Sequence, residues 1–178
     1  MKLKFIKFKK LSDTAIVPTK AHAYDAGFDL FADEDCTMMY GETKVVQTNI
    51  AIELPDGYMA DVRPRSGLTL NTSLRVHYGT VDATYRGSVG IICENASYNM
   101  IPDYMESLKK IERSKDEEQA LQNTLEAIRL AKAMMYEIKR GDKIAQLVIQ
   151  KIPDVELFET DVLNETNRGS GGFGSTGI

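Results

Sequence analysis

The stretch NIAIELPDGYMADVRP, residues 49–64, decides the fold class. In each half, apolar residues occupy every second position: Ile50, Ile52 and Leu54 in the first, Tyr58, Ala60 and Val62 in the second. This period of two is typical of β-strands with one face buried. Pro55-Asp56-Gly57 between the halves is a turn signal. Short strands separated by tight turns predict a β-sandwich or barrel.

Outward from this stretch, residues 1–95 show the same strand character. LKFIKF (3–8) and KIAQLVIQKI (143–152) are predicted strands, and HYGTVDATYRGSVG (77–90) is predicted to form a β-hairpin. Many short strands of this kind predict a mainly β domain.

Between Pro102 and Lys139 the apolar period becomes helical, and Pro102 suits a first helical turn. Ser114 and Glu117 have the spacing of a capping box, which predicts a second helix starting at Ser114. The predicted apolar stripe comprises Leu121, Leu125, Ile128, Met135 and Ile138. We therefore expect a β core at 1–97 and 140–166, an inserted α-helical hairpin at 98–139, and a flexible Gly-rich C-terminal lid at 167–178.

Bulk composition narrows the class of protein. A chain of 178 residues fits one domain, and a net charge of −4 argues against a general nucleic-acid or membrane-surface binder. Cys36 and Cys93 lack the paired spacing of a zinc site and are interpreted as reduced thiols. The basic N-terminus has no uninterrupted apolar core, and no stretch is long enough to span a bilayer, so a cytoplasmic location is expected.

Five segments contain more Gly, Asp, Arg and Ser than strands require: AYDAGFDLFA (23–32), PRSGLTLN (64–71), 77–90, RGDKIAQLVIQ (140–150) and RGSGGFGSTGI (168–178). Each alone also fits an ordinary turn. The second and the last of these segments supply cations and hydroxyls that can bind oxyanions: Arg65, Ser66, Arg168, Ser170, Ser175 and Thr176. No P-loop, dinucleotide-binding glycine motif or His/Cys metal cluster occurs. The predicted chemistry is an Asp as base, arginines on phosphate, and Mg²⁺ held mostly by phosphate oxygens.

In this order and spacing, the five segments resemble the five motifs of the homotrimeric dUTP pyrophosphatases (dUTPases), over residues 21–95 and 140–177. The resemblance implies a jelly-roll subunit in a homotrimer, with three active sites at subunit interfaces. It also implies hydrolysis of dUTP to dUMP and pyrophosphate, with Mg²⁺ bound to the triphosphate.

Residue roles follow from the same resemblance. Asp82 matches the acid that activates the water attacking the α-phosphorus, and Arg65 matches the arginine that holds this acid. Asp29 matches the acid that supports the water shell of the metal, and Tyr85 matches the ring that packs on the sugar. The other matched residues are expected to bind substrate: Ser66, Gly67, Gly79, Thr80, Val81, Gln146, Arg168, Gly172, Phe173, Gly174, Ser175 and Thr176.

Two alternatives stay open at this point. One is a regulatory protein that is gated by nucleotide and acts through protein–protein contacts. The other is a dCTP deaminase-like enzyme, which shares this type of fold; the Gly-Thr-Val-Asp stretch and the Phe-containing tail favour dUTP hydrolysis instead.

The insert at 98–139 resembles the extra segment of some phage-encoded members, a subset associated with regulation through protein partners. It is interpreted either as passive decoration or as a module that binds a regulatory protein. For the second reading, the candidate surface comprises Met100, Met105, Met134, Met135 and Tyr104.

Overall fold

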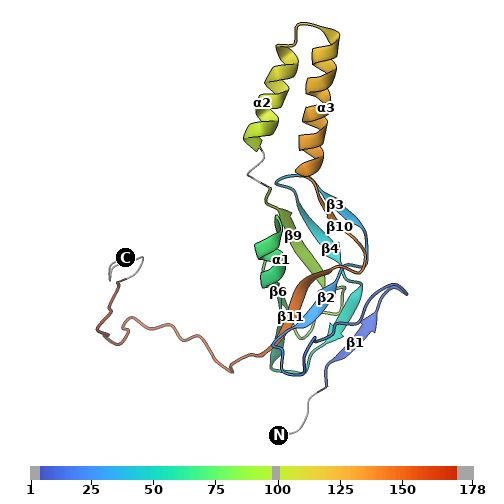
Figure 1. Ribbon diagram of the computed structural model, residues 1–178. Coiled ribbons are helices and arrows are strands. Elements are labelled where there is room, and N and C mark those ends of the chain that lie inside the picture. The colour runs from blue at the N-terminus through green and yellow to red at the C-terminus, as the bar shows by residue number, and fades with distance from the viewer. Residues whose placement is uncertain (1–4, 98–100, 172–178) are drawn as a thin grey trace.

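The computed structural model describes residues 5–97 and 101–171 (Figure 1). The elements in chain order are β1 (Lys7–Lys10), β2 (Phe28–Phe31), β3 (Cys36–Met38), β4 (Thr43–Gln47), β5 (Ile50–Glu53), β6 (Tyr58–Pro64), α1 (Ser66–Asn71), β7 (Leu74–Val76), β8 (Gly79–Val81), β9 (Gly90–Asn95), α2 (Ile101–Glu112), α3 (Glu117–Ala133), β10 (Tyr136–Ile138) and β11 (Lys143–Lys151). The prediction of a mainly β fold is confirmed.

The strands form small antiparallel sheets around one hydrophobic core. A four-stranded sheet has the order β2-β11-β6-β8 and a three-stranded sheet the order β4-β9-β7, with β1-β5 and β10-β3 as two-stranded additions. The largest fully buried side chains come from several of these sheets: Leu30, Met38, Ile50, Leu74, Ile91, Ile138 and Ile144. The sheets therefore enclose a common apolar interior.

The stretch 49–64 supplies strands to two different sheets. Gly57, at φ +76°, closes the turn between them, and the amide of Tyr58 donates to the carbonyl of Pro55 at 3.1 Å. Strand β5 pairs with β1, whereas β6 pairs with β11 and β8. Strand β6 is thus central in the four-stranded sheet, and it leads directly into α1.

Three local predictions are wrong. Residues 77–90 do not form a hairpin, because β8 pairs with β6 while β9 pairs with β4 and β7 in the other sheet. Residues 66–71 form helix α1 rather than part of an open turn. The first strand lies at Lys7–Lys10 rather than at 3–8, and residues 3 and 4 of that prediction lie outside the described range.

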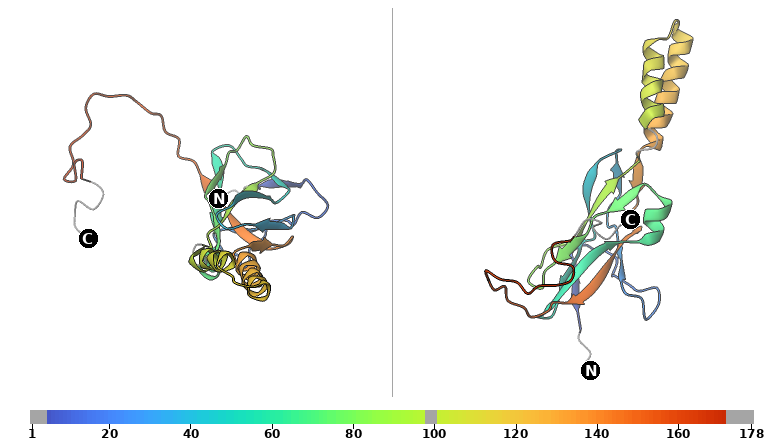
Figure 2. Two further views of the ribbon diagram at one scale, coloured as in Figure 1. Left: turned by 90° about the horizontal axis from the view of Figure 1, so that it is seen from above. Right: turned by 90° about the vertical axis from the view of Figure 1, so that its left-hand side faces the viewer.

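Helices α2 and α3 form the predicted hairpin, which projects away from the β body (Figures 1 and 2). The N-cap of α3 is Asp116 instead of Ser114, because the Asp116 carboxylate accepts from the amide of Gln119 at 2.8 Å. The Ser114 hydroxyl instead donates to the carbonyl of Lys110. No helix in the described ranges is long and apolar enough to cross a membrane.

The predicted apolar stripe of the hairpin is divided by the structure. Leu121, Leu125 and Ile128 lie on α3 but are about half exposed, at 59%, 52% and 47%. The helix ends at Ala133, and residues 136–138 form strand β10, which pairs with β3. Helical period therefore identified α3 correctly but assigned it too much of the chain and the wrong burial.

Beyond β11 the chain leaves the body (Figure 1). Strand β11 ends at Lys151, and the amide of Ile152 makes a last bond to the carbonyl of Gly57 at 2.8 Å. From residue 152 to 170 every position is exposed and none belongs to a helix or strand. The β body of the single chain therefore ends about fifteen residues before the expected boundary at 166.

Candidate active site

Three of the five motif segments meet at one polar pocket of about 550 Å³. Segment 23–32 enters β2, segment 64–71 joins β6 to α1, and segment 140–150 forms most of β11. Cavities of this size hold small organic ligands. The lining residues are Ala21, Asp25, Ala26, Gly27, Asp29, Arg65, Ser66, Gly67, Leu68, Thr72 and Gln146.

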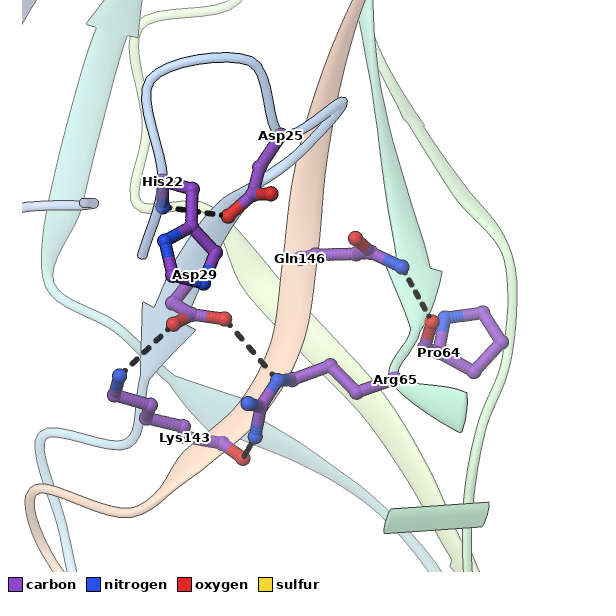
Figure 3. A network of polar contacts seen from close by, with 7 residues as sticks. All are labelled: His22, Asp25, Asp29, Pro64, Arg65, Lys143 and Gln146. Atoms are coloured by element: carbon purple, nitrogen blue, oxygen red, sulfur yellow. Dashed lines mark hydrogen bonds and ion pairs between the residues drawn. The ribbon is translucent and has the colours of Figure 1, made fainter. Parts of the chain in front are cut away.

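Asp29 is the centre of a charged cluster at the pocket wall (Figure 3). Its two carboxylate oxygens form ion pairs with Arg65 Nε at 3.1 Å and with Lys143 Nζ at 3.0 Å. The Arg65 guanidinium also donates to the carbonyl of Lys143 at 2.8 Å. Because the Asp29 side chain is only 14% exposed, these pairs fix the arginine beside the pocket.

Within one chain Arg65 therefore contacts Asp29. The contact with Asp82 that the resemblance implied stays a prediction for a site between subunits. Sequence reasoning missed Lys143, although a cation three residues before Gln146, at the start of the same predicted strand, was the available signal.

Gln146 is positioned by its neighbours on both sides. It lies opposite Asp29 on β2 and Arg63 on β6, and its Nε2 donates to the carbonyl of Pro64 at 2.9 Å (Figure 3). A Cβ atom at Gly27 would lie 2.5 Å from Gln146 Oε1. Any larger residue there would make the Gln146 side chain shift, so Gly27 is a site residue that the sequence analysis quoted but did not single out.

Asp25 serves the turn that borders the pocket. Its carboxylate accepts from the amide of His22 at 2.7 Å, and the amide of Asp25 donates back to the carbonyl of His22 at 3.1 Å. The reading of this acid as a turn-capping group is confirmed, and its side chain also lines the pocket.

Asp82 lies far from the pocket in the same chain. Strands β2 and β8 are the two edges of the four-stranded sheet. The pairing Ala60↔Val81, continued by one residue, places Asp82 beside Met59, at the opposite end of β6 from Arg65. At the rise of an extended strand, that separation is roughly 20 Å. Within the described residues, the exposed Asp82 carboxylate makes no hydrogen bond or ion pair.

The other residues of segment 77–90 lie with Asp82. Gly79, Thr80 and Val81 form β8, which is bonded to β6 along one side only. The Tyr85 hydroxyl donates to the carbonyl of Ser88 at 3.1 Å, and its ring packs over Gly87 while remaining 47% exposed. The structure thus divides the predicted site residues into a pocket group and a β8 group.

The C-terminal segment is the third, separate group. Arg168 Nε donates to the carbonyl of Gly171 at 2.9 Å, in a turn that is exposed and remote from the body (Figure 1). The remaining predicted tail residues lie outside the described range: Gly172, Phe173, Gly174, Ser175 and Thr176.

The chain itself offers few ligands to a metal ion. Within residues 5–97 and 101–171, no three His, Cys, Asp or Glu side chains converge on one point. Both oxygens of Asp29 face cations. This donor set fits a Mg²⁺ ion held mainly by a ligand's own oxygens, with Asp29 reaching it only through water.

An arginine, a hydroxyl and a glycine that converge on a ligand-sized polar pocket define a protein that binds a phosphorylated small molecule. Comparisons specify the family. A family model described as dUTPase matches residues 13–102 and 130–177. The chain is 39% identical over 175 residues to a deoxyuridine 5'-triphosphate nucleotidohydrolase of Gloeothece citriformis, a match covering 97% of both chains. This chain belongs to the dUTPase family.

Two solved phage structures are similar to it. The dUTPase of Staphylococcus bacteriophage 80alpha with dUpNHpp has a TM-score of 0.76 and 26% identity, covering 99% of this chain and all of that one. The dUTPase of phage phi11 of S. aureus, described with a species-specific insert, has a TM-score of 0.70 and 26% identity, covering 92% of this chain and all of that one.

Proposed function

We propose that the protein hydrolyses dUTP to dUMP and pyrophosphate, in active sites that are shared between copies of the chain. The observation that carries the proposal is the meeting of segments 23–32, 64–71 and 140–150 at one pocket, in a chain of the dUTPase family. Ser66, Gly67 and Gln146 line this pocket, and in the proposal they bind the phosphates.

A homotrimer of jelly-roll subunits brings the separated groups together. The pocket of one subunit receives Asp82 and Tyr85 from a neighbouring subunit, since these residues lie too far away in the same chain. A closed cyclic assembly gives three equivalent sites from one such interface. The C-terminal segment from Arg168 onward closes over the assembled site, with Arg168, Ser175 and Thr176 on phosphate and Phe173 on uracil.

In the completed site Asp82 acts as general base. Its carboxylate takes a proton from the water that attacks the α-phosphorus, while Arg65 and the hydroxyl of Ser66 stabilise the developing negative charge on the phosphate oxygens. The uracil edge is read by backbone groups of Gly79, Thr80 and Val81 on the unpaired side of β8.

Mg²⁺ bound to the triphosphate oxygens would neutralise charge and orient the chain of phosphates, with Asp29 supporting its water shell. The chain's own part is to hold the Asp29 carboxylate in place through its ion pairs with Arg65 and Lys143.

The test is a pyrophosphate-release assay against a panel of deoxynucleoside triphosphates. We expect turnover of dUTP in strong preference to dCTP and dTTP, and no ammonia from dCTP, which separates hydrolysis from deamination. Asp82→Asn should cut kcat by about 10²–10⁴ while dUTP still binds, as expected for loss of a general base. Near-normal kcat in this variant would remove Asp82 from the mechanism.

A second function is proposed for the α2–α3 hairpin: docking of a regulatory protein. Leu121, Leu125 and Ile128 follow the i, i+4, i+7 spacing on one side of α3 and are half exposed. Large apolar side chains grouped on a surface mark interaction sites. The 80alpha dUTPases are described as controlling transfer of virulence genes by a G protein-like mechanism, which supports a nucleotide-gated role for this insert.

The exposed stripe replaces the Met-rich surface expected from the sequence. Met134 is buried at 7% exposure and Met100 lies outside the described residues, whereas Met105 remains 49% exposed. Changing the three stripe residues to Gln should abolish capture of a partner and leave dUTP hydrolysis intact. A non-hydrolysable dUTP analogue should alter partner capture by the unmodified protein. If neither the Gln substitutions nor the analogue changes partner capture, the hairpin is a passive decoration.

A further inference from the structure

Helix α1 carries Ser66 and Gly67 into the pocket, and its own residues add two side-chain bonds, from Asn71 to the carbonyl of Gly67 at 2.9 Å and from Thr72 to that of Leu68 at 2.7 Å. It has six residues, none of them buried, and its N-cap residue Arg65 makes no side-chain capping bond. No acidic residue lies in its first turn and no basic residue in its last. Helices this short are unstable without outside contacts. The position of the phosphate-facing residues therefore depends on what holds α1 from outside.

Arg75 supplies that hold from β7. One guanidinium nitrogen, Nη1, donates to the carbonyls of Thr69, Leu74 and Thr72 at 3.1, 2.9 and 2.7 Å. The carbonyls at Thr69 and Thr72 belong to the end of α1, where helical carbonyls lack partners within the helix. A charged donor makes such bonds stronger than neutral ones, and half-burial of Arg75 limits competition from water.

Strand β7 is itself a firm support. Its pairing with β9 places Leu74 opposite Asn95 and Arg75 opposite Glu94, and Leu74 is fully buried in the core. Asn95, also fully buried, accepts from the Ser73 hydroxyl at 2.8 Å and donates to the carbonyl of Met134 at 2.7 Å. The backbone that carries Arg75 is thus fixed both to the core and to the root of the hairpin.

We propose that Arg75 is a positioning residue for phosphate binding: by holding the end of α1, it sets where Ser66 and Gly67 meet the substrate's phosphates. This inference rests on the proposed dUTP-binding function. It assigns a role to a side chain outside the five motif segments and outside the lining of the pocket. Because Arg75 acts only through α1, its influence is confined to the phosphate end of the ligand.

The test compares a phosphorylated ligand with its nucleoside in the assembled full-length protein. Arg75→Met, which keeps the aliphatic length and removes the donors, should weaken binding of the dUTP analogue dUpNHpp roughly tenfold. Binding of 2′-deoxyuridine, which has no phosphate, should stay unchanged. KM for dUTP should rise in step with the loss of analogue binding. Arg75→Lys, which restores a charged donor, should recover most of the affinity.

Arg129→Met is the matched control, since Arg129 is an exposed arginine of α3 whose side chain is 81% exposed. It should change neither affinity. If Arg75→Met does not assemble, Arg75→Gln takes its place with the same expected pattern. Equal losses for dUpNHpp and 2′-deoxyuridine, or no loss for either, would overturn the positioning role. Failure of the unmodified protein to hydrolyse dUTP would instead count against the proposed function, because the binding comparison does not depend on turnover.

Discussion

Mixing two inactive variants should restore activity, because we propose that the catalytic groups of one site come from different copies of the chain. The first variant, Asp82→Asn, removes the general base, and the second, Arg65→Met, removes a cation from the pocket. Arg65 is 34% exposed on its side chain, so its loss should leave the subunit folded. The reasoning rests on the strand register that separates Arg65 and Asp82 by roughly 20 Å in one chain, much more than an arginine side chain spans.

The size of the recovery follows from counting copies. A site works when its pocket comes from an Asp82→Asn subunit and its base from an Arg65→Met neighbour. With equal amounts mixed at random around a cyclic assembly, about one quarter of sites meet this condition. The two proteins are unfolded together, refolded and assayed for pyrophosphate release. Each variant refolded alone should stay inactive.

A chain carrying both substitutions, mixed equally with unmodified protein, is the matched control. If sites are shared between subunits, about one quarter of the sites receive both their pocket and their base from unmodified chains. If each chain held a whole site, about one half of the sites would be active. No recovery in mixed assemblies of verified composition, together with one-half activity in the control, would refute the division of the site.

Three further outcomes are expected. Gly27→Ala places a methyl group against Gln146 Oε1, so KM for dUTP should rise severalfold with little change in thermal stability. An unchanged KM would show that Gln146 does not contact the substrate. Truncation before Arg168 should abolish turnover while the subunits still fold and assemble, because every residue from 152 to 170 is exposed; full activity would make the tail dispensable. Burial raises the pKa of Cys93 to about 12, with the nearby Cys36 adding to the effect, so a thiol reagent at pH 8 should modify Cys36 first and Cys93 only on unfolding.

Strands were predictable where the run of apolar and β-branched residues was long. KIAQLVIQKI was expected at 143–152 and β11 occupies Lys143–Lys151, where Ile144, Ala145 and Leu147 are buried in the core. Helix α1 was not predictable, because six residues that include a glycine, a threonine and an asparagine have no helical period. Its conformation comes instead from contacts such as those of Arg75, which lie later in the chain.

The N-cap of α3 was predicted at the wrong residue because two nearby residues are both suited to cap a helix. Ser114 and Asp116 are both good N-caps, and sequence spacing favoured the serine because of Glu117. In the structure Asn123 bonds the Ser114 hydroxyl at 2.9 Å, which leaves Asp116 to cap the helix. This tertiary contact has no sequence signature.

For the site, as for the fold, the sequence predicted local features but not contacts between distant residues. The five segments predicted which residues carry the chemistry, but not which of them lie together within one chain. Sheet order decides that, because β2 and β8 lie at opposite edges with β11 and β6 between them. Pairing of strands far apart in sequence is the information that a single sequence lacks.

The two ends of the α2–α3 hairpin meet the β body close together, so this segment can be replaced by another. Asn95 bonds the carbonyls of Met38 and Met134, so the chain leaves and re-enters the β body at adjacent points. Closing a longer loop across such a gap costs only about 0.6 kcal/mol for each doubling of its length. Segments of very different size and surface can therefore be exchanged at this opening without rebuilding the pocket. The same opening is a natural place for an engineer to mount an epitope or a reporter domain.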